Sequence, residues 1–307
     1  MNASPTEAAR AGRALPPAPP PTDSPAARRV PEAAWAVLLL APALLLLAAL
    51  FVYPLALSLK SAVSDAGGAL SPINFLNVLD RYSGDVIYTG VVSVAAVIVT
   101  GLIAIAIGGY LTLGESRATV AALRWLYRWP LFIPMIVAGQ AMRSFLAKNG
   151  LMNNIFVSLG LLDPTHTVGL LDWRGVIVTF VWKQLPFVTL ILAGAMASLD
   201  RGTIEAARNL GAGRLRVLME IVVPQVTGPL VVASVLTFVT LLSVLSVPLM
   251  INAGSPAMIT VDMAYRITSL NDYGTANALG VISYLMTAAV AWLYLRQGVR
   301  EHGRAAR

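Results

Sequence analysis

Long apolar stretches with few or no charges alternate with shorter polar segments over most of the chain. About 20 apolar residues in a helix cross the hydrocarbon core of a bilayer. Six stretches come near or exceed that length, so we predict an all-α membrane protein with one six-helix transmembrane domain over residues 31–299. The expected spans are about 33–59, 86–113, 129–147, 175–199, 226–250 and 273–295.

The first apolar stretch has to be distinguished from a signal peptide. The apolar part of a signal peptide has about 7–15 residues and precedes a cleavage site of small residues. The stretch from Ala33 to Leu59 is longer, carries no charge and contains Tyr53-Pro54 near its end. These features favour a first transmembrane helix.

The two ends of the chain differ from the apolar stretches in composition. Residues 1–30 are rich in alanine and proline, and such a segment cannot bury enough apolar surface to offset the entropy lost on ordering. We therefore expect residues 1–30 to form a disordered tail and residues 300–307 a short basic tail.

The overall composition supports a membrane protein. Charged residues make up 12% of the chain, against about 25% in soluble domains. The net charge of +7 is spread between apolar stretches without a basic, aromatic-rich face, so nucleic acid is not an expected partner. With no cysteine and two distant histidines, we expect no disulfide, thiolate or other metal centre.

Basic residues predict the orientation of the spans, because cytoplasmic segments carry an excess of lysine and arginine. Most arginines fall in residues 1–30, 117–128, 200–224 and 296–307, which places both termini and the segment from Asp200 to Pro224 in the cytoplasm. The opposite side holds Lys60, Arg81, Arg143, Lys148, Arg174 and Arg266.

Motifs of catalysis are missing from the sequence. None of the three lysines follows a glycine as a phosphate-binding loop requires, so ATP hydrolysis would have to come from another subunit. The spans contain no histidine and no pair of aspartates, which argues against an intramembrane enzyme. A channel that works without ATP stays open as an alternative.

The segment from Asp200 to Pro224 is longer and more charged than a simple connection requires. Asp200 or Thr203 is a candidate cap for a first short helix, and Gly211 is suited to end it in the left-handed conformation. A second helix is expected from Arg214 to Val222, stopping before Pro224. The residues alone fit equally a docking element and an amphipathic connector at the headgroups.

The same segment resembles the EAA loop of binding-protein-dependent ABC import permeases. The matching positions are Glu205, Ala206, Ala207, Gly211, Ile221 and Pro224, with Val223 in place of the usual leucine. The resemblance extends over roughly residues 33–296. It implies the fold of a type I ABC importer permease, a multi-pass protein of the bacterial inner membrane.

The resemblance also implies partners and residue roles. The loop would be the helix that couples the permease to a cytoplasmic ABC ATPase dimer, through Glu205, Ala206, Ala207, Arg208, Gly211 and Pro224. A second permease subunit, identical or different, would complete the path through the bilayer, and an extracytoplasmic solute-binding protein would deliver the solute. The chain itself would bind no cofactor, because the partner ATPase uses the ATP.

Polar residues inside the expected spans are candidates for the solute path, because polar groups at membrane depth are costly. These candidates are Gln140, Arg143, Lys183 and Gln184. An alternative for Lys183 is that it reaches the outer headgroups or pairs inside the bundle.

Two subfamilies compete for the solute. The stretch 143–162 and Asn209-Leu210-Gly211-Ala212 resemble spermidine/putrescine permeases, whereas INAGSPA at 251–257 and NDYGTANALG at 271–280 resemble carbohydrate permeases. We take the polyamine-like subfamily as the first expectation and carbohydrate as the second. If Arg143 and Lys183 line the path, a neutral or anionic solute suits them better than a polycation.

Overall fold

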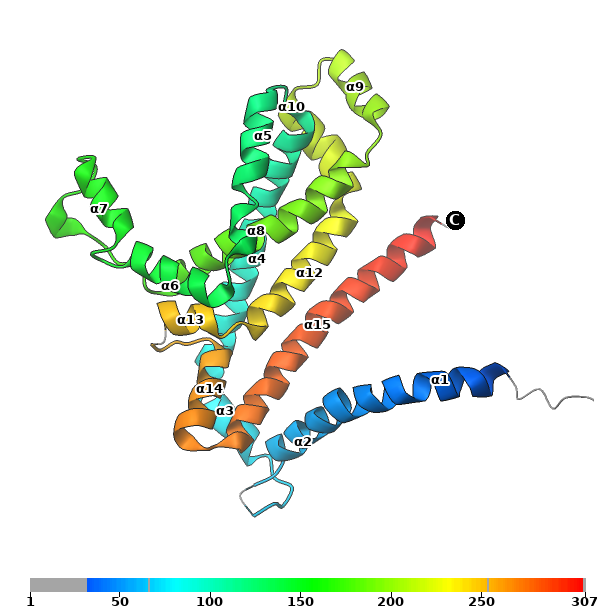
Figure 1. The fold of residues 1–307 in the computed structure, drawn as a ribbon, viewed down its shortest axis with the longest axis vertical. Helices are drawn as coiled ribbons and strands as arrows, with labels where there is room; N and C mark the ends of the chain where they lie inside the picture. The colour runs from blue at the N-terminus through cyan, green and yellow to red at the C-terminus, as the bar shows by residue number, and fades with distance from the viewer. Residues whose placement is uncertain (1–31, 66, 253, 306–307) are drawn as a thin grey trace, which may run out of the picture. The chain divides into compact units, whose positions relative to one another are not determined.

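The computed structural model describes residues 32–65, 67–252 and 254–305, and these residues are helical with short connections (Figure 1). The expected tail of residues 1–30 lies outside the described residues. The chain divides into two units, residues 1–55 and 56–307. Among the described residues, four continuous helices have the length and composition to cross a membrane, and two bent helix pairs reach that length together.

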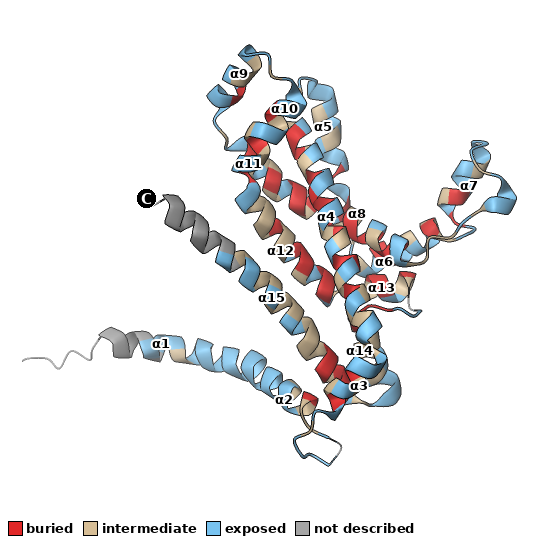
Figure 2. Cartoon of the chain, turned by 180° about the vertical axis from the view of Figure 1, so that it is seen from behind, coloured by how far each residue is buried: buried red, intermediate tan, exposed pale blue. Residues whose placement is uncertain are grey.

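The described part of the first unit is one helical run. It consists of α1 (Glu32–Leu47), the π-helical segment η1 (Ala48–Val52) and the start of α2 (Tyr53–Ala62). Its apolar side chains, including Leu45 and Phe51, are largely exposed (Figure 2). An exposed apolar surface of this length suits contact with lipid.

The second unit is built around four long helices, α4 (Ser83–Leu113), α8 (Trp173–Ala197), α12 (Thr227–Ser243) and α15 (Tyr273–Ala305). The most extensive packing is between α4 and α8. Small side chains on α4, such as the buried Ala96 and Ala104, let the two backbones approach closely. On α8, Phe180 and Leu192 are fully buried, each in a separate core cluster.

The third expected span is broken, which corrects the prediction of one helix over 129–147. The structure has α5 (Arg117–Leu126), the 3-10 turn η2 (Trp129–Phe132) and α6 (Met135–Leu146), with a bend of 109° between the two halves. Pro134 has no N–H to donate to the carbonyl of Pro130. The amide of Ile133, at 3.3 Å, and the side chain of Lys183, on α8, both donate to that carbonyl.

The fifth expected span, 226–250, is broken for the same reason. The helix α12 ends at Ser243, and a separate short helix, α13 (Ser246–Ile251), follows. Pro248 cannot donate to the carbonyl of Val244, which accepts a hydrogen bond of 3.0 Å from the Thr260 hydroxyl. At both breaks a distant side chain therefore donates to the carbonyl four residues before the proline.

Short helices lie in the connections that charge counting assigns to the outside. They are α3 (Ile73–Arg81), α7 (Leu151–Ser158), η3 (Pro164–His166) and α14 (Ile259–Leu270). Two buried asparagines hold this region. Asn74 donates to the carbonyls of Ser61, Ala62 and Ser64, and Asn153 donates to those of Ala147, Lys148 and Val168.

One partly buried carboxyl group in this region should make the stability of the protein depend on pH. One oxygen of Asp262, on α14, is buried without a hydrogen-bond partner in the described chain. Burial, aided by the nearby charge of Asp85 and opposed by that of Arg266, raises the pKa of Asp262 from its ordinary 3.8 to about 7. The native state then keeps a proton that the unfolded chain releases, so stability falls as the pH rises from about 4 to about 7.

The Asp262→Asn variant should flatten this part of the profile, as measured by thermal unfolding in detergent between pH 4 and pH 8. Asp80→Asn is the control, because Asp80 is an exposed carboxylate on α3. An unchanged slope in the Asp262 variant would show that another group causes the dependence.

Candidate functional site

The connection between α8 and α12 contains a short helix, α9 (Arg201–Asn209), with a well-defined start. The carboxylate of Asp200 accepts hydrogen bonds from the amides of Gly202 at 3.0 Å and Thr203 at 3.2 Å, and from the Thr203 hydroxyl at 2.9 Å. These bonds lower the pKa of Asp200 and satisfy amides that have no partner within the helix. Asp200, and not Thr203, is the cap.

The end of α9 is fixed by Gly211. Its φ of +85° is left-handed, a conformation that costs glycine no steric strain. The amide of Gly211 donates to the carbonyl of Arg208 at 2.9 Å, and the amide of Ala212 donates to that of Ala207 at 3.0 Å. These two bonds form a Schellman motif, which ends the helix and reverses the chain direction.

Opposite faces of α9 have different surroundings. Ile204 is 9% exposed, and Ala207 packs against the same core cluster as Ile204. Arg208 donates to the carbonyl of Leu113 at the end of α4, at 2.9 Å. These contacts fix α9 to the helical bundle.

The outer face of α9 is free of such contacts. Glu205 and Ala206 are exposed, and Leu210 is 89% exposed. Of the two alanines in the motif only Ala206 is exposed, because the side chain of Ala207 is directed to the bundle. A small alanine between a carboxylate and an exposed leucine is a surface that another protein can approach closely.

The second half of the connection continues further than the sequence predicts. It runs through α10 (Arg214–Val217), the π-helical segment η4 (Leu218–Val222) and α11 (Val223–Gln225), so the helix does not stop before Pro224. Pro224 lies in the first turn of α11, where its missing N–H is tolerated. The chain bends by 73° before α12, and Arg214 forms an ion pair with Glu115 across the connection.

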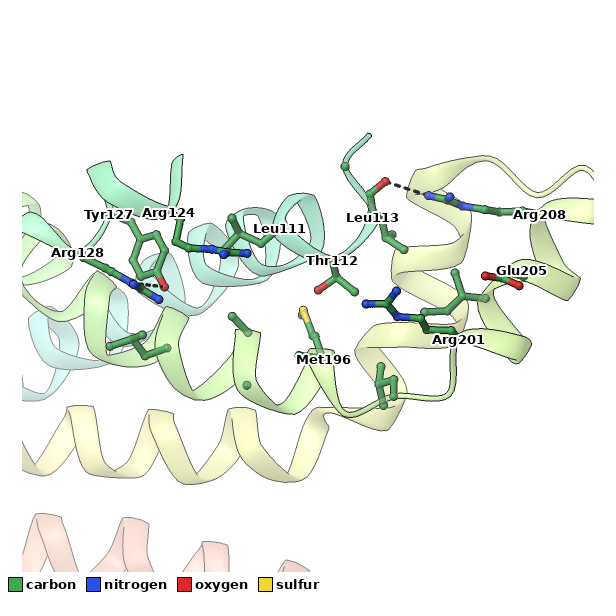
Figure 3. A pocket seen from close by; sticks show the side chains of 17 residues that line it. Leu111, Thr112, Leu113, Arg124, Tyr127, Arg128, Met196, Arg201, Glu205 and Arg208 are labelled. Atoms are coloured by element: carbon green, nitrogen blue, oxygen red, sulfur yellow. Dashed lines mark hydrogen bonds between the residues drawn. The ribbon is translucent and has the colours of Figure 1, made fainter. Parts of the chain in front are cut away.

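A cleft of about 650 Å³ lies beside α9 (Figure 3). It is enclosed by the end of α4, by α5 and the residues that follow it, by the second half of α8, and by α9. Four arginines line it: Arg124, Arg128, Arg201 and Arg208. Glu205 is the one carboxylate among its described lining residues.

None of the four candidates for the solute path lines this cleft. Gln140 and Arg143 are exposed on α6, whereas Gln184 is buried in α8. Lys183 is half-buried, and its ammonium group is bonded to the carbonyl of Pro130. The structure thus brings Lys183 to the break in the third span, whereas the two α6 side chains are exposed.

The Lys183→Met variant should separate a structural role from contact with solute. Loss of a charged donor to a buried carbonyl costs about 1–3 kcal/mol, so thermal unfolding should occur several degrees lower while the half-saturating solute concentration for uptake stays unchanged. Lys148→Met, which changes an exposed lysine outside the helices, is the control. Unchanged stability together with weaker uptake would favour a place in the solute path.

Several contacts around the site could not be anticipated from local patterns. The bond from Arg208 to Leu113 joins residues 95 positions apart, and the cleft is assembled from four separate helices. The basic composition of residues 117–128 was the one local signal, because it placed Arg124 and Arg128 on the same side of the membrane as α9.

Comparison with known proteins agrees with this architecture. The family described as "Binding-protein-dependent transport system inner membrane component" matches residues 104–298. A sulfoquinovosyl glycerol transport permease of Agrobacterium fabrum is 26% identical over 85% of this chain and 89% of its own length. A trehalose/maltose transport permease of Thermococcus litoralis is 25% identical over 61% of this chain and 65% of its own.

Other similarities extend over most of the chain. A Salmonella typhimurium permease named for transport of 2-aminoethylphosphonate is 25% identical over 84% of this chain and 92% of its own. In a crystal structure of a bacterial alginate ABC transporter bound to its periplasmic protein, one chain superposes with a TM-score of 0.72, at 16% identity over 88% of this chain and 96% of that one. The chain therefore belongs to the binding-protein-dependent transport system inner membrane components, and it is a permease subunit of an ABC importer of the bacterial inner membrane, not an enzyme.

Proposed function

We propose that the chain forms half of the translocation path for a carbohydrate or a related polyhydroxylated solute, and that α9 couples this path to a cytoplasmic ATPase. Two of the similar permeases are named for glycoside or disaccharide transport, which favours the carbohydrate reading over the polyamine-like one. An external binding protein delivers the solute, and a second permease subunit forms the other half of the path.

The observation that carries the coupling proposal is the division of α9 into two faces. Arg208 joins it to the end of α4, and Ile204 lies in a core cluster with residues of α4 and α8. Ala206 and Leu210 are exposed on the other face, and Glu205 is exposed at the edge beside the cleft. An exposed leucine next to a small residue suits insertion into a groove of a partner protein. In the cytoplasm, that partner is the ATPase.

Coupling requires a stiff connection, and both ends of α9 supply it. The Asp200 cap and the Schellman motif at Gly211 hold the helix as one body, and Arg208 fixes it to the end of α4. When ATP draws two ATPase subunits together, movement of α9 passes to α4 and α8 through these contacts. The four-helix bundle then alternates between inward-open and outward-open arrangements.

Reconstitution in proteoliposomes tests the proposal. The permease with its ATPase and binding protein should accumulate a radiolabelled solute only when ATP is present on the ATPase side. Flux in vesicles without ATPase would instead show a channel. Binding of a sugar panel and of 2-aminoethylphosphonate to the purified binding protein identifies the solute class, and binding of the phosphonate alone would contradict the carbohydrate proposal.

The Leu210→Asp variant tests the docking face separately. A charged side chain in place of an exposed apolar anchor should weaken ATPase binding by about 30-fold or more, as expected for a loss of about 2 kcal/mol at an interface hot spot. Pull-down of the ATPase with the detergent-purified permease measures the effect. Leu70→Asp changes an equally exposed leucine in the segment expected outside the membrane, and it should leave ATPase binding unchanged.

A further inference from the structure

The cleft beside α9 gathers positive charge, including two arginines, Arg124 and Arg128, that have no role in the proposed coupling. Four guanidinium groups line it, and none of them forms an ion pair with a carboxylate in the described chain. Arg208 is bonded to the carbonyl of Leu113, and Arg128 donates to the Tyr127 hydroxyl at 3.2 Å. Arg124 and Arg201 approach from opposite ends of the cleft (Figure 3). With Glu205 as the one carboxylate among its described lining residues, the cleft keeps an excess of positive charge, which favours an anionic ligand.

The geometry favours a phosphate group over a single point charge. Guanidinium groups bind phosphate with two parallel hydrogen bonds, and they retain their charge at all physiological pH values. A volume of about 650 Å³ lies within the range of small-molecule sites. The cleft therefore has room for a phosphate together with the group that carries it.

The surroundings of α5 indicate where such a phosphate comes from. Trp125 and Trp129 are exposed, with ring centroids 4.9 Å apart, next to Arg124 and Arg128. Exposed tryptophan beside arginine is typical of the level of the lipid headgroups. Basic pockets between spans on the cytoplasmic side bind anionic headgroups.

From these observations we infer that the cleft binds the phosphate group of an anionic phospholipid of the inner leaflet, held between Arg124 and Arg201, with Arg128 and Arg208 adding positive charge at the two ends of the cleft. The inference rests on the cytoplasmic placement of α9 in the proposed function. Because Arg201 and Arg208 belong to α9 and Arg124 to α5, a bound headgroup links the coupling helix to the broken third span. Lipid composition then regulates the coupling step.

The test uses the purified full-length chain without ATPase, so that a failure of coupling does not affect it. Native mass spectrometry compares retention of phosphatidylglycerol and phosphatidylcholine. Each arginine near an anionic membrane surface contributes about a fivefold gain in affinity, or about 30-fold for two. Arg124→Gln/Arg201→Gln should therefore reduce retention of phosphatidylglycerol by roughly 30-fold and leave phosphatidylcholine unchanged.

The control variant removes the same net charge outside the cleft. Arg117, on α5, and Arg216, which pairs with Glu220, are exposed and do not line the cleft. Arg117→Gln/Arg216→Gln should change retention less than about twofold, because exposed charges are screened by salt. Thermal unfolding confirms that both variants are folded.

Two outcomes would overturn the inference. Equal losses in the two double variants, or equal retention of both lipids by the unmodified chain, would show that the cleft is not a phosphate site. A third arm adds inorganic phosphate to the delipidated chain. Thermal stabilisation that requires Arg124 and Arg201, without preference for phosphatidylglycerol, would overturn the lipid as source and assign the cleft to a soluble phosphate.

Discussion

Replacement of Gly211 by proline is expected to abolish ATP-driven uptake while the protein remains inserted in the membrane. Proline requires a φ near −65°, whereas Gly211 has +85°. The substitution also removes the amide that donates to the carbonyl of Arg208. The Schellman motif cannot form, so α9 loses its fixed end and the movement of the ATPase no longer reaches α4. Uptake in proteoliposomes and membrane-fraction blots measure the two parts of the result.

The same substitution two residues later provides a matched control. Gly213 has a φ of −66°, which already suits proline, and a side chain added there meets open space. The Gly213→Pro variant should transport at close to the unmodified rate. If both variants were inactive, chain flexibility and not the turn at Gly211 would be the requirement. If both were active, the stiffness of α9 would not be needed for coupling.

Reversal of the charge at Glu205 is expected to have the second-largest effect. Glu205 is exposed on the outer face of α9 and is the one carboxylate lining the arginine-rich cleft in the described chain. Glu205→Lys removes a negative charge offered to the ATPase and adds a positive one. Truncating or reversing a charge at the centre of an interface costs about 2–5 kcal/mol, so ATPase binding should weaken at least 30-fold and uptake should cease.

Glu220, in the same connection between α8 and α12, provides the control for the Glu205→Lys variant. Glu220, on η4, is exposed and pairs with Arg216 at 3.0 Å. Because an exposed pair contributes at most about 1 kcal/mol, Glu220→Lys should leave ATPase binding nearly unchanged. Similar loss in both variants would mean that net charge of the connection, and not the face of α9, governs docking.

The parts of the fold that sequence could predict are those governed by local rules. The spans that became α4 and α8 were placed within three residues of their ends, because hydrophobicity and length alone define a helix in a bilayer. The turn at Gly211 followed from the conformational freedom of glycine. The amphipathic pattern of α9 did not reveal whether Ala206 or Ala207 faces outward, because that depends on which core cluster Ile204 packs into.

The broken spans could not be predicted because their stabilising partners are far away in the sequence. Pro134 and Pro248 were visible, but a proline in a membrane helix can kink it or end it. At the two breaks, the side chains of Lys183 and Thr260 donate to the carbonyls of Pro130 and Val244. The polarity of Lys183 suggested contact with solute. In the structure its ammonium group is bonded to the carbonyl of Pro130 instead.

The arginine-lined cleft could not be predicted either, because its residues are also far apart in the sequence. Each arginine taken alone indicates only the cytoplasmic side of the membrane. Their position around one cleft depends on the fold, which brings the end of α4, α5, the second half of α8 and α9 together, and on the bond from Arg208 to Leu113. A binding site formed from four helices becomes visible only with the fold.

Site-directed cross-linking at α9 tests the central claim most directly, because the chain has no cysteine of its own. A single cysteine replaces the exposed Ala206, the core-packed Ala207 or, in the segment expected outside, the exposed Leu161. With a thiol-to-amine reagent on the assembled importer, Ala206→Cys should yield a covalent product with the ATPase, and the other two should yield little or none. A product absent at Ala206, or equally abundant at Leu161, would contradict docking of α9 on the ATPase.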